Sequence, residues 1–189
     1  MIAEGANSND LAVNARNEIY FTEPPTKRVW FIDAKGANRV VHEGIAFPNG
    51  VRLSPDQSLL LVDDSQGKWV WSFQVMPEGS LANGVPLHRL ETMDDSSASG
   101  AYGMTVDSDG YLYVASKMGI QICDQAGRVT AIISKPQTAP LSNVVFWGRG
   151  FANAVCDEWG QGLQAPSAVE RHVSVDGGDA AEASSVKVI

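Results

Sequence analysis

The residues of this 189-residue chain that could do chemistry recur at the start of a repeated segment. Asn9, Asn49 and Asn143 each precede an apolar stretch, and Tyr102 takes the corresponding place in the third copy. The four starts are separated by 40, 53 and 41 residues, which is close to the length of one four-stranded propeller blade. Asn at such places most often caps a turn. From the residues alone, turn capping and a role in a functional site both stay open.

Other reactive side chains lack the spacing that catalysis or metal binding requires. The histidines share no ligand spacing and are expected at the surface or in hairpins. The serines before the third copy have neither a paired histidine nor a nucleophile-elbow motif. The acidic pairs and the segment 107–110 lack the rest of a calcium loop, so solvated turns are expected, and the two cysteines are expected to be unpaired thiols. These residues are His42, His88, His172, Ser96, Ser97, Ser99, Asp63, Asp64, Asp94, Asp95, Cys123 and Cys156.

The composition is that of a globular protein, with 44% hydrophobic and 19% charged residues. The formal net charge is −8, and the cationic residues are scattered, so a nucleic-acid partner is not expected. No apolar stretch approaches the roughly 18 residues of a membrane span. The start of the chain carries no targeting pattern, and it looks truncated. The compartment is therefore not indicated, and a soluble, cytoplasmic protein is the default expectation.

Each copy of the repeat predicts short strands separated by turns. The turns use Asp, Asn, Gly and Pro, and the strands carry β-branched and aromatic residues in alternation. No window has helical periodicity. This pattern predicts an all-β protein, and short strands at blade-length spacing favour a β-propeller. The expected strands are 11–13, 19–21, 29–32, 51–53, 59–62, 69–73, 104–106, 111–114 and 120–122.

The pattern changes after Phe146, so residues 1–148 are predicted to form a propeller fragment. Residues 149–189 are rich in Ala, Gly, Ser and Val and are predicted to form an irregular, disordered tail. The sequence supplies about three and a half blades, which cannot close a ring. We therefore expect either a piece of a larger propeller or self-association through unpaired blade edges.

Several phrases of the chain, in their order, resemble the SMP-type gluconolactonase family, which includes regucalcin-like proteins. The likeness spans residues 8–146, and it implies a six-bladed β-propeller of which this chain is a part. Single phrases such as Ser-Pro-Asp are common among propellers, whereas the ordered set is specific. The phrases are at 8–11, 19–24, 48–50, 53–56, 70–73, 77–81, 103–107 and 112–115.

The resemblance implies one divalent cation at a mouth of the central channel, where the polar residues at the start of each blade converge. Its ligands in the family are a Glu from an early blade, an Asn and an Asp, with a further Asn at the site. Asn49 matches the ligand Asn, and Asn9 matches the further Asn, which would hold the metal-bound water or the substrate. Tyr102 stands where the family has its Asp, and the early Glu has no counterpart because Glu4 is not in the matching phrase. Oxygen ligands favour Ca²⁺, with Mg²⁺, Mn²⁺ and Zn²⁺ as alternatives.

The implied activity is metal-dependent hydrolysis of a small-molecule lactone of a sugar acid. Two family carboxylates are missing here, and a phenol such as that of Tyr102 is a poor base and a weak ligand at neutral pH. We therefore predict weak metal binding and impaired turnover. The alternative is a non-catalytic propeller that binds a ligand or acts as a scaffold, which would need neither carboxylate.

Overall fold

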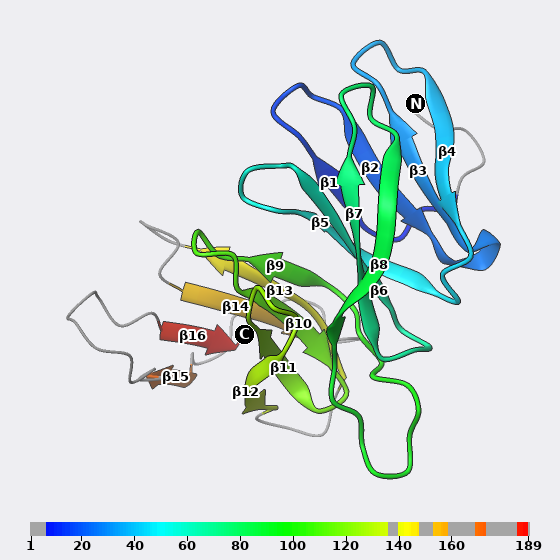
Figure 1. Cartoon of the computed structure of the whole chain (residues 1–189). Helices are drawn as coiled ribbons and strands as arrows, with labels where there is room; N and C mark the ends of the chain where they lie inside the picture. The colour runs from blue at the N-terminus through cyan, green and yellow to red at the C-terminus, as the bar shows by residue number, and fades with distance from the viewer. Residues whose placement is uncertain (1–6, 136–139, 148–152, 159–168, 173–184, 189) are drawn as a thin grey trace.

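The strands of the protein form four sheets of four strands each (Figure 1). The computed structural model describes residues 7–135, 140–147, 153–158, 169–172 and 185–188. We call the first three sheets blades 1, 2 and 3, because each is an antiparallel meander of four consecutive strands. A 3₁₀-helix, η1 (Pro24–Thr26), joins the second and third strands of blade 1, and no α-helix occurs among the described residues.

In each blade the strands follow one another in chain order, from the first strand, which contacts the neighbouring sheets, to the fourth strand on the outside. Blade 1 has β1 (Leu11–Val13), β2 (Ile19–Glu23), β3 (Arg28–Ile32) and β4 (Asn38–Glu43). Blade 2 has β5 (Pro48–Leu53), β6 (Leu59–Asp64), β7 (Trp69–Val75) and β8 (Leu81–Arg89). Blade 3 has β9 (Met104–Val106), β10 (Leu112–Ser116), β11 (Gly119–Cys123) and β12 (Val129–Ser134).

The fourth sheet differs from the blades in its strand order. It contains β13 (Leu141–Trp147), β14 (Asn153–Glu158), β15 (Val169–His172) and β16 (Ser185–Val188) in the order β13-β14-β16-β15. β14 and β16 are parallel, whereas the other two pairs are antiparallel. The predicted tail overlaps this sheet and the residues outside the described ranges, and the domain boundary at 148 stays a prediction.

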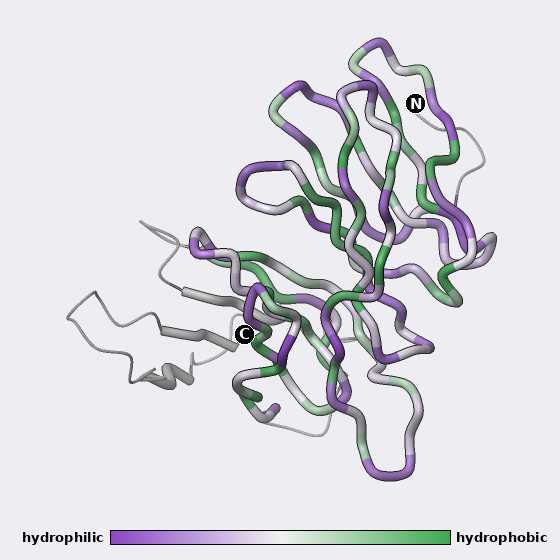
Figure 2. The backbone as a smooth tube through the Cα atoms, in the orientation of Figure 1, coloured by the Kyte–Doolittle hydropathy of each residue, from purple (hydrophilic) through white to green (hydrophobic). Residues whose placement is uncertain are grey.

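The core lies between adjacent blades, and strand β6 shows why. Successive side chains of a strand point to opposite faces. Leu60 and Val62 pack into the cluster shared with blade 1, and Leu61 packs into the cluster shared with blade 3. The unbroken apolar run of β6 is therefore explained by burial on both faces. Figure 2 shows hydrophobic segments along the strands and hydrophilic segments at the turns.

The inner strands of successive sheets pack side by side. β5 contacts β1 and β2, β9 contacts β5, and β13 contacts β9 and β10. Residues at the starts of the four sheets line one cavity, whereas the ends of β5, β9 and β13 and the turns after β5 and β9 line another, so the first strands of the sheets run in the same sense. We call the end with the strand starts the mouth end and the opposite end the turn end. The four polar starts of the repeats are thus brought to the mouth end.

The strands expected from sequence are confirmed, with ends that differ by a few residues. The strand predicted at 111–114 is observed at 112–116, because Tyr111 completes the preceding turn.

Cys123 is a buried free thiol, as expected, and burial raises its pKa to about 12. His88, expected at the surface or in a hairpin, lies in the β7–β8 hairpin and is buried there, and burial lowers its pKa to about 4. Within the described residues, no helix has the length and apolar character needed to cross a bilayer.

Candidate active site at the mouth end

The polar residues at the starts of the repeats line one cavity at the mouth end. Its volume is about 240 Å³, and its lining includes side chains from the starts of all four sheets. The site residues predicted from sequence are Asn9, Asn49 and Tyr102, and all three line this cavity. The lining residues are Asn9, Asp10, Asn49, Tyr102, Gly103, Ser142 and Asn143.

Four of these lining residues were given no role from sequence, namely Asp10, Gly103, Ser142 and Asn143. Asn143 was noted as the fourth polar start, and the repeat spacing alone could have placed it at the cavity. Asp10 directly follows Asn9, so its position in the repeat was the available signal. For Ser142 no sequence signal points to the site. Chain neighbours of the repeat starts therefore complete the cavity.

A β-bulge presents Asn49. The pairing of β5 with β6 is interrupted between Pro48 and Val51, so Asn49 and Gly50 lie opposite Asp63 without regular partners. The Gly50 N–H donates to the Asp63 carboxylate at 3.0 Å. A Cβ at Gly50 would collide with the main-chain oxygen of Tyr102 and with the Asp63 carboxylate, so a glycine is required. Bulges next to sites commonly redirect a side chain, and this one turns Asn49 towards the cavity.

The Asn49 side chain is buried and fixed by neighbouring groups. It is 3% exposed, and its Nδ2 donates to Ser65 Oγ at 2.9 Å. The Ser65 hydroxyl donates in turn to the main-chain oxygen of Ala101. The hydroxyl of Thr22, from blade 1, donates to the main-chain oxygen of Asn49. Asn49 is therefore held by groups from all three blades.

Asp10 is a carboxylate at the cavity, but its charge is already compensated. Its Oδ2 accepts from the Val51 N–H at 3.0 Å and forms an ion pair with Arg52 at 3.2 Å. Its Oδ1 accepts from the Leu11 N–H at 2.8 Å. These contacts join blade 1 to blade 2. Asp10 therefore serves the contact between blades and has little capacity left for a ligand.

Asp63 lies behind the cavity as a fully buried carboxyl group. Its Oδ1 has no hydrogen-bond partner among the residues that the structure describes, and Oδ2 accepts the Gly50 N–H. Burial raises the pKa of Asp63 well above its usual value, and the nearby Asp10 and Asp64 carboxylates add to the rise. The shift favours the neutral acid. Asp63 therefore adds less negative charge to the mouth end than an exposed carboxylate would.

The third and fourth repeats meet at Gly103. The Gly103 N–H donates to the main-chain oxygen of Ser142 at 2.9 Å. A Cβ at Gly103 would collide with the side chain of Asn143, so the absence of a side chain allows the close approach. Asn143 Oδ1 accepts from the Val144 N–H at 2.8 Å. Tyr102 is half-buried beside this contact.

The donor set does not fit a firmly held divalent cation. Amides, a phenol and a hydroxyl face the cavity, and the carboxylate of Asp10 is paired with Arg52. Among the described residues, no three His, Cys, Asp or Glu side chains are grouped closely enough to hold a metal ion. Neutral oxygens compensate a double positive charge poorly. The prediction of weak metal binding is consistent with this chemistry and stays a prediction.

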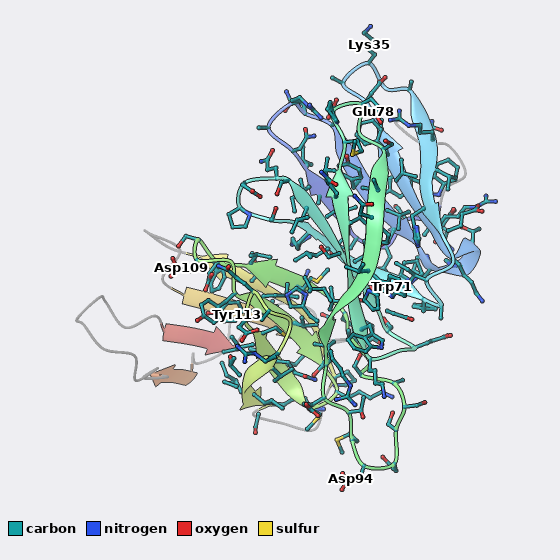
Figure 3. The ribbon with its side chains drawn as sticks, viewed as in Figure 1. Lys35, Trp71, Glu78, Asp94, Asp109 and Tyr113 are labelled. Carbon is teal, nitrogen blue, oxygen red and sulfur yellow. The ribbon has the colours of Figure 1, made fainter. Side chains whose placement is uncertain are left out.

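A larger cavity of about 530 Å³ lies at the turn end, with Arg52, Asp107, Tyr113 and Phe146 in its lining. The Asp107 carboxylate accepts from the N–H groups of Asp109 and Tyr111 and from the Tyr113 hydroxyl. Its acceptor capacity is therefore used within its own turn and the following strand. Figure 3 labels Asp109 and Tyr113 in this part of blade 3. The larger cavity is therefore a weaker candidate for chemistry than the mouth end.

The SMP-30/gluconolactonase/LRE-like region family matches residues 2–155. The chain belongs to this family. A gluconolactonase of Zymomonas mobilis is 29% identical over 168 residues, which is 75% of this chain and 45% of that protein. The family resemblance identified from sequence is thereby confirmed. The chain spans about half the length of this relative.

Solved structures of the family have the same propeller-type fold. A putative gluconolactonase has a TM-score of 0.65 at 20% identity, over 78% of this chain and 55% of that one. A gluconolactonase from Xanthomonas campestris has a TM-score of 0.61 at 23% identity, over 74% and 50%. A calcium-binding regucalcin from Agrobacterium tumefaciens has a TM-score of 0.64 at 16% identity, over 76% and 50%. The all-β propeller fold is confirmed, and the number of six blades stays an expectation.

Proposed function

We propose that the mouth-end cavity is a lactone-hydrolase site of the gluconolactonase type, with low turnover in this chain. The observation that carries the proposal is the convergence of the four repeat starts on one cavity. Membership of the family and the likeness to a gluconolactonase support the same substrate class, a small lactone of a sugar acid. In this proposal Asn49 and Asn9 hold the ligand, and Tyr102 stands where a carboxylate would raise the activity.

Hydrolysis of a lactone requires a polarised carbonyl group and a base that accepts a proton from water. A divalent cation would supply the polarisation as a Lewis acid, and the neutral donor set predicts that Ca²⁺ or Zn²⁺ binds weakly. Asp10 is a poor candidate for the base because its carboxylate oxygens are already occupied by Arg52 and by the N–H groups of Val51 and Leu11. The amides of Asn9 and Asn49 are well suited to hydrogen bonding with sugar hydroxyls. Binding should therefore be retained better than turnover.

The test restores the missing carboxylate with Tyr102→Asp. Calorimetry would measure Ca²⁺ and Zn²⁺ binding, and lactone hydrolysis would be followed in the same samples. The added charge should tighten cation binding on the order of tenfold or more and raise hydrolysis above that of the parent. Tyr111→Asp is the matched control, because it adds the same charge at the turn end, where Tyr111 is 40% exposed. Equal hydrolysis by the parent and both variants would refute impairment by Tyr102.

A second function, non-catalytic binding of a neutral polyhydroxylated ligand, is favoured by the amide and phenol lining of the cavity. Amides provide both donors and acceptors for hydroxyl groups, and an aromatic ring provides an apolar face. This function predicts ligand binding that is unchanged by a chelator and accompanied by no turnover, even in Tyr102→Asp. Binding that is lost with the chelator would refute it.

A further inference from the structure

We infer that Ser65 is a positioning residue that orients the Asn49 side-chain amide so that its Oδ1, rather than its Nδ2, is turned towards the mouth-end cavity. The inference deepens the proposed function, since it concerns the polarity that this site offers to a ligand. It rests on a chain of three groups: the Ala101 main-chain oxygen, the Ser65 hydroxyl and the Asn49 amide.

The order of donors and acceptors along this chain follows from chemistry. A main-chain carbonyl oxygen can only accept a hydrogen bond, so the single proton of the Ser65 hydroxyl goes to Ala101. The Ser65 oxygen is then left with lone pairs, and its contact with Asn49 requires a donor. The only donor on the Asn49 side chain is Nδ2. The amide oxygen must therefore point away from Ser65.

Ser65 is itself held in place by its main chain. Its N–H donates to the oxygen of Phe47 at 3.1 Å, and its own oxygen accepts from the Gly100 N–H at 3.2 Å. Phe47 lies just before strand β5, and Gly100 lies just before the third repeat start. The Ser65 hydroxyl thus has little freedom to leave the chain of hydrogen bonds. Ala101 also directly precedes Tyr102, which links the orientation of Asn49 to the neighbouring repeat start.

The orientation restricts what the cavity accepts near Asn49. An amide oxygen that lines the cavity attracts a hydrogen-bond donor, such as a sugar hydroxyl, or a cation. It repels a carboxylate or phosphate oxygen, which would need the Nδ2 group. With the opposite orientation the preference would be reversed. Ser65 therefore contributes to selection of hydroxyl-bearing ligands without touching them.

The test measures hydrogen exchange of the Asn49 side-chain amide protons by NMR, with the signal assigned by its loss in Asn49→Asp. Ser65→Ala should speed exchange of the bonded Nδ2 proton on the order of tenfold, since one hydrogen bond is removed. Ser65→Thr should restore protection because it keeps the hydroxyl. Ser116→Ala is the control, since Ser116 is buried and its hydroxyl donates to the Gly119 main-chain oxygen and accepts from the side-chain amide of Gln121, with no bond to Asn49 or Ala101. Equal exchange in Ser65→Ala and the parent would overturn the inference.

A second comparison keeps the inference testable if Ser65→Ala does not fold. Asn49→Asp is nearly isosteric, but it places a second acceptor against the single Ser65 proton. It should therefore lower the urea midpoint of unfolding clearly more than Asn9→Asp, because Asn9 is exposed. Equal midpoints for the two variants would overturn the inference. The exchange and unfolding measurements need no lactone turnover, so failure of the proposed function would leave them informative.

Discussion

The two ends of the inner strands use polar side chains in different ways. At the turn end, carboxylates accept hydrogen bonds from their own turn. At the mouth end, polar groups reach across to a neighbouring sheet. This contrast separates polar residues that stabilise their own turn from polar residues whose partners come from another sheet.

Asp56 and Asp33 illustrate the turn end. Asp56 accepts from the hydroxyls of Ser54 and Ser58 and from the Ser58 N–H, and these bonds lower its pKa to about 2. Asp33 accepts from the N–H groups of Lys35 and Ala37. Figure 3 labels Lys35 at this end of blade 1 and Glu78 at the same end of blade 2. Every one of these bonds lies within four residues of the carboxylate, so the turn sequence is sufficient to form it.

Asn49 and Asp10 illustrate the mouth end. The main-chain oxygen of Asn49 accepts a hydrogen bond from the Thr22 hydroxyl of blade 1. The Ser65 hydroxyl, which contacts the Asn49 amide, donates to the main-chain oxygen of Ala101 just before blade 3. Asp10 bonds Val51 and Arg52, which lie 41 and 42 residues away in the chain. These groups acquire their partners only when the sheets pack. The mouth end is therefore the part of the molecule in which sequence changes alter function and assembly together.

The largest effect is expected for Gly50→Ala. The new Cβ would collide with the Tyr102 main-chain oxygen and the buried Asp63 carboxylate, so the bulge must shift. We expect a loss of about 2–4 kcal/mol of unfolding free energy, measured by urea unfolding. Gly67→Ala is the control, because its Cβ would meet only the half-exposed Asp64 side chain, which can rotate. A similar loss in both variants would contradict the special constraint at the mouth end.

A smaller effect is expected for Arg52→Met, which removes the partner of Asp10 from the contact between blades. The pair is partly buried, and Arg52 also donates to the Leu11 main-chain oxygen. We expect about 1–2 kcal/mol of destabilisation and a cation affinity at the mouth raised a few-fold, because the Asp10 charge is released. Urea unfolding and Ca²⁺ calorimetry measure the two effects.

The control for Arg52→Met is Arg28→Met. Arg28 pairs with Glu43 inside blade 1, and both side chains are well exposed, at 41% and 60%. Exposed pairs contribute little, so the change should be below about 0.5 kcal/mol, with no effect on cation affinity. If Arg28→Met proved as costly as Arg52→Met, ion pairs between blades would have no greater importance than those within a blade.

The smallest effect is expected at the turn end, for Asp56→Asn. The folded pKa of Asp56 lies below its ordinary value of 3.8. Its contribution to stability is therefore present above about pH 4 and is lost as the pH falls towards about 2. Thermal unfolding should show a slightly weaker pH dependence between pH 4 and 2 in the variant than in the parent. An identical dependence would show that these turn bonds do not favour the ionised form of Asp56 in the folded state.

Local sequence patterns were enough to predict the first three strands of each blade and the turns between them, but not the bounds of the fourth strands β4, β8 and β12. Alternation in 11–13 and 104–106, and turn residues such as those at 107–110, act over a few neighbouring residues, so their outcome does not depend on the rest of the fold. The repeat spacing also indicated that Asn9, Asn49 and Tyr102 occupy equivalent places. The family likeness supplied their expected roles.

The arrangement of side chains in the mouth-end cavity depends on tertiary packing. The pairing of Asp10 with Arg52, the burial of Asp63 and the orientation of Asn49 by Ser65 all depend on which sheets pack together. No local pattern encodes them, because their partners are brought close by the hydrophobic packing of separate blades. Because of that packing, the Asp10 carboxylate pairs with Arg52 and Val51 of the neighbouring blade instead of being available to a ligand.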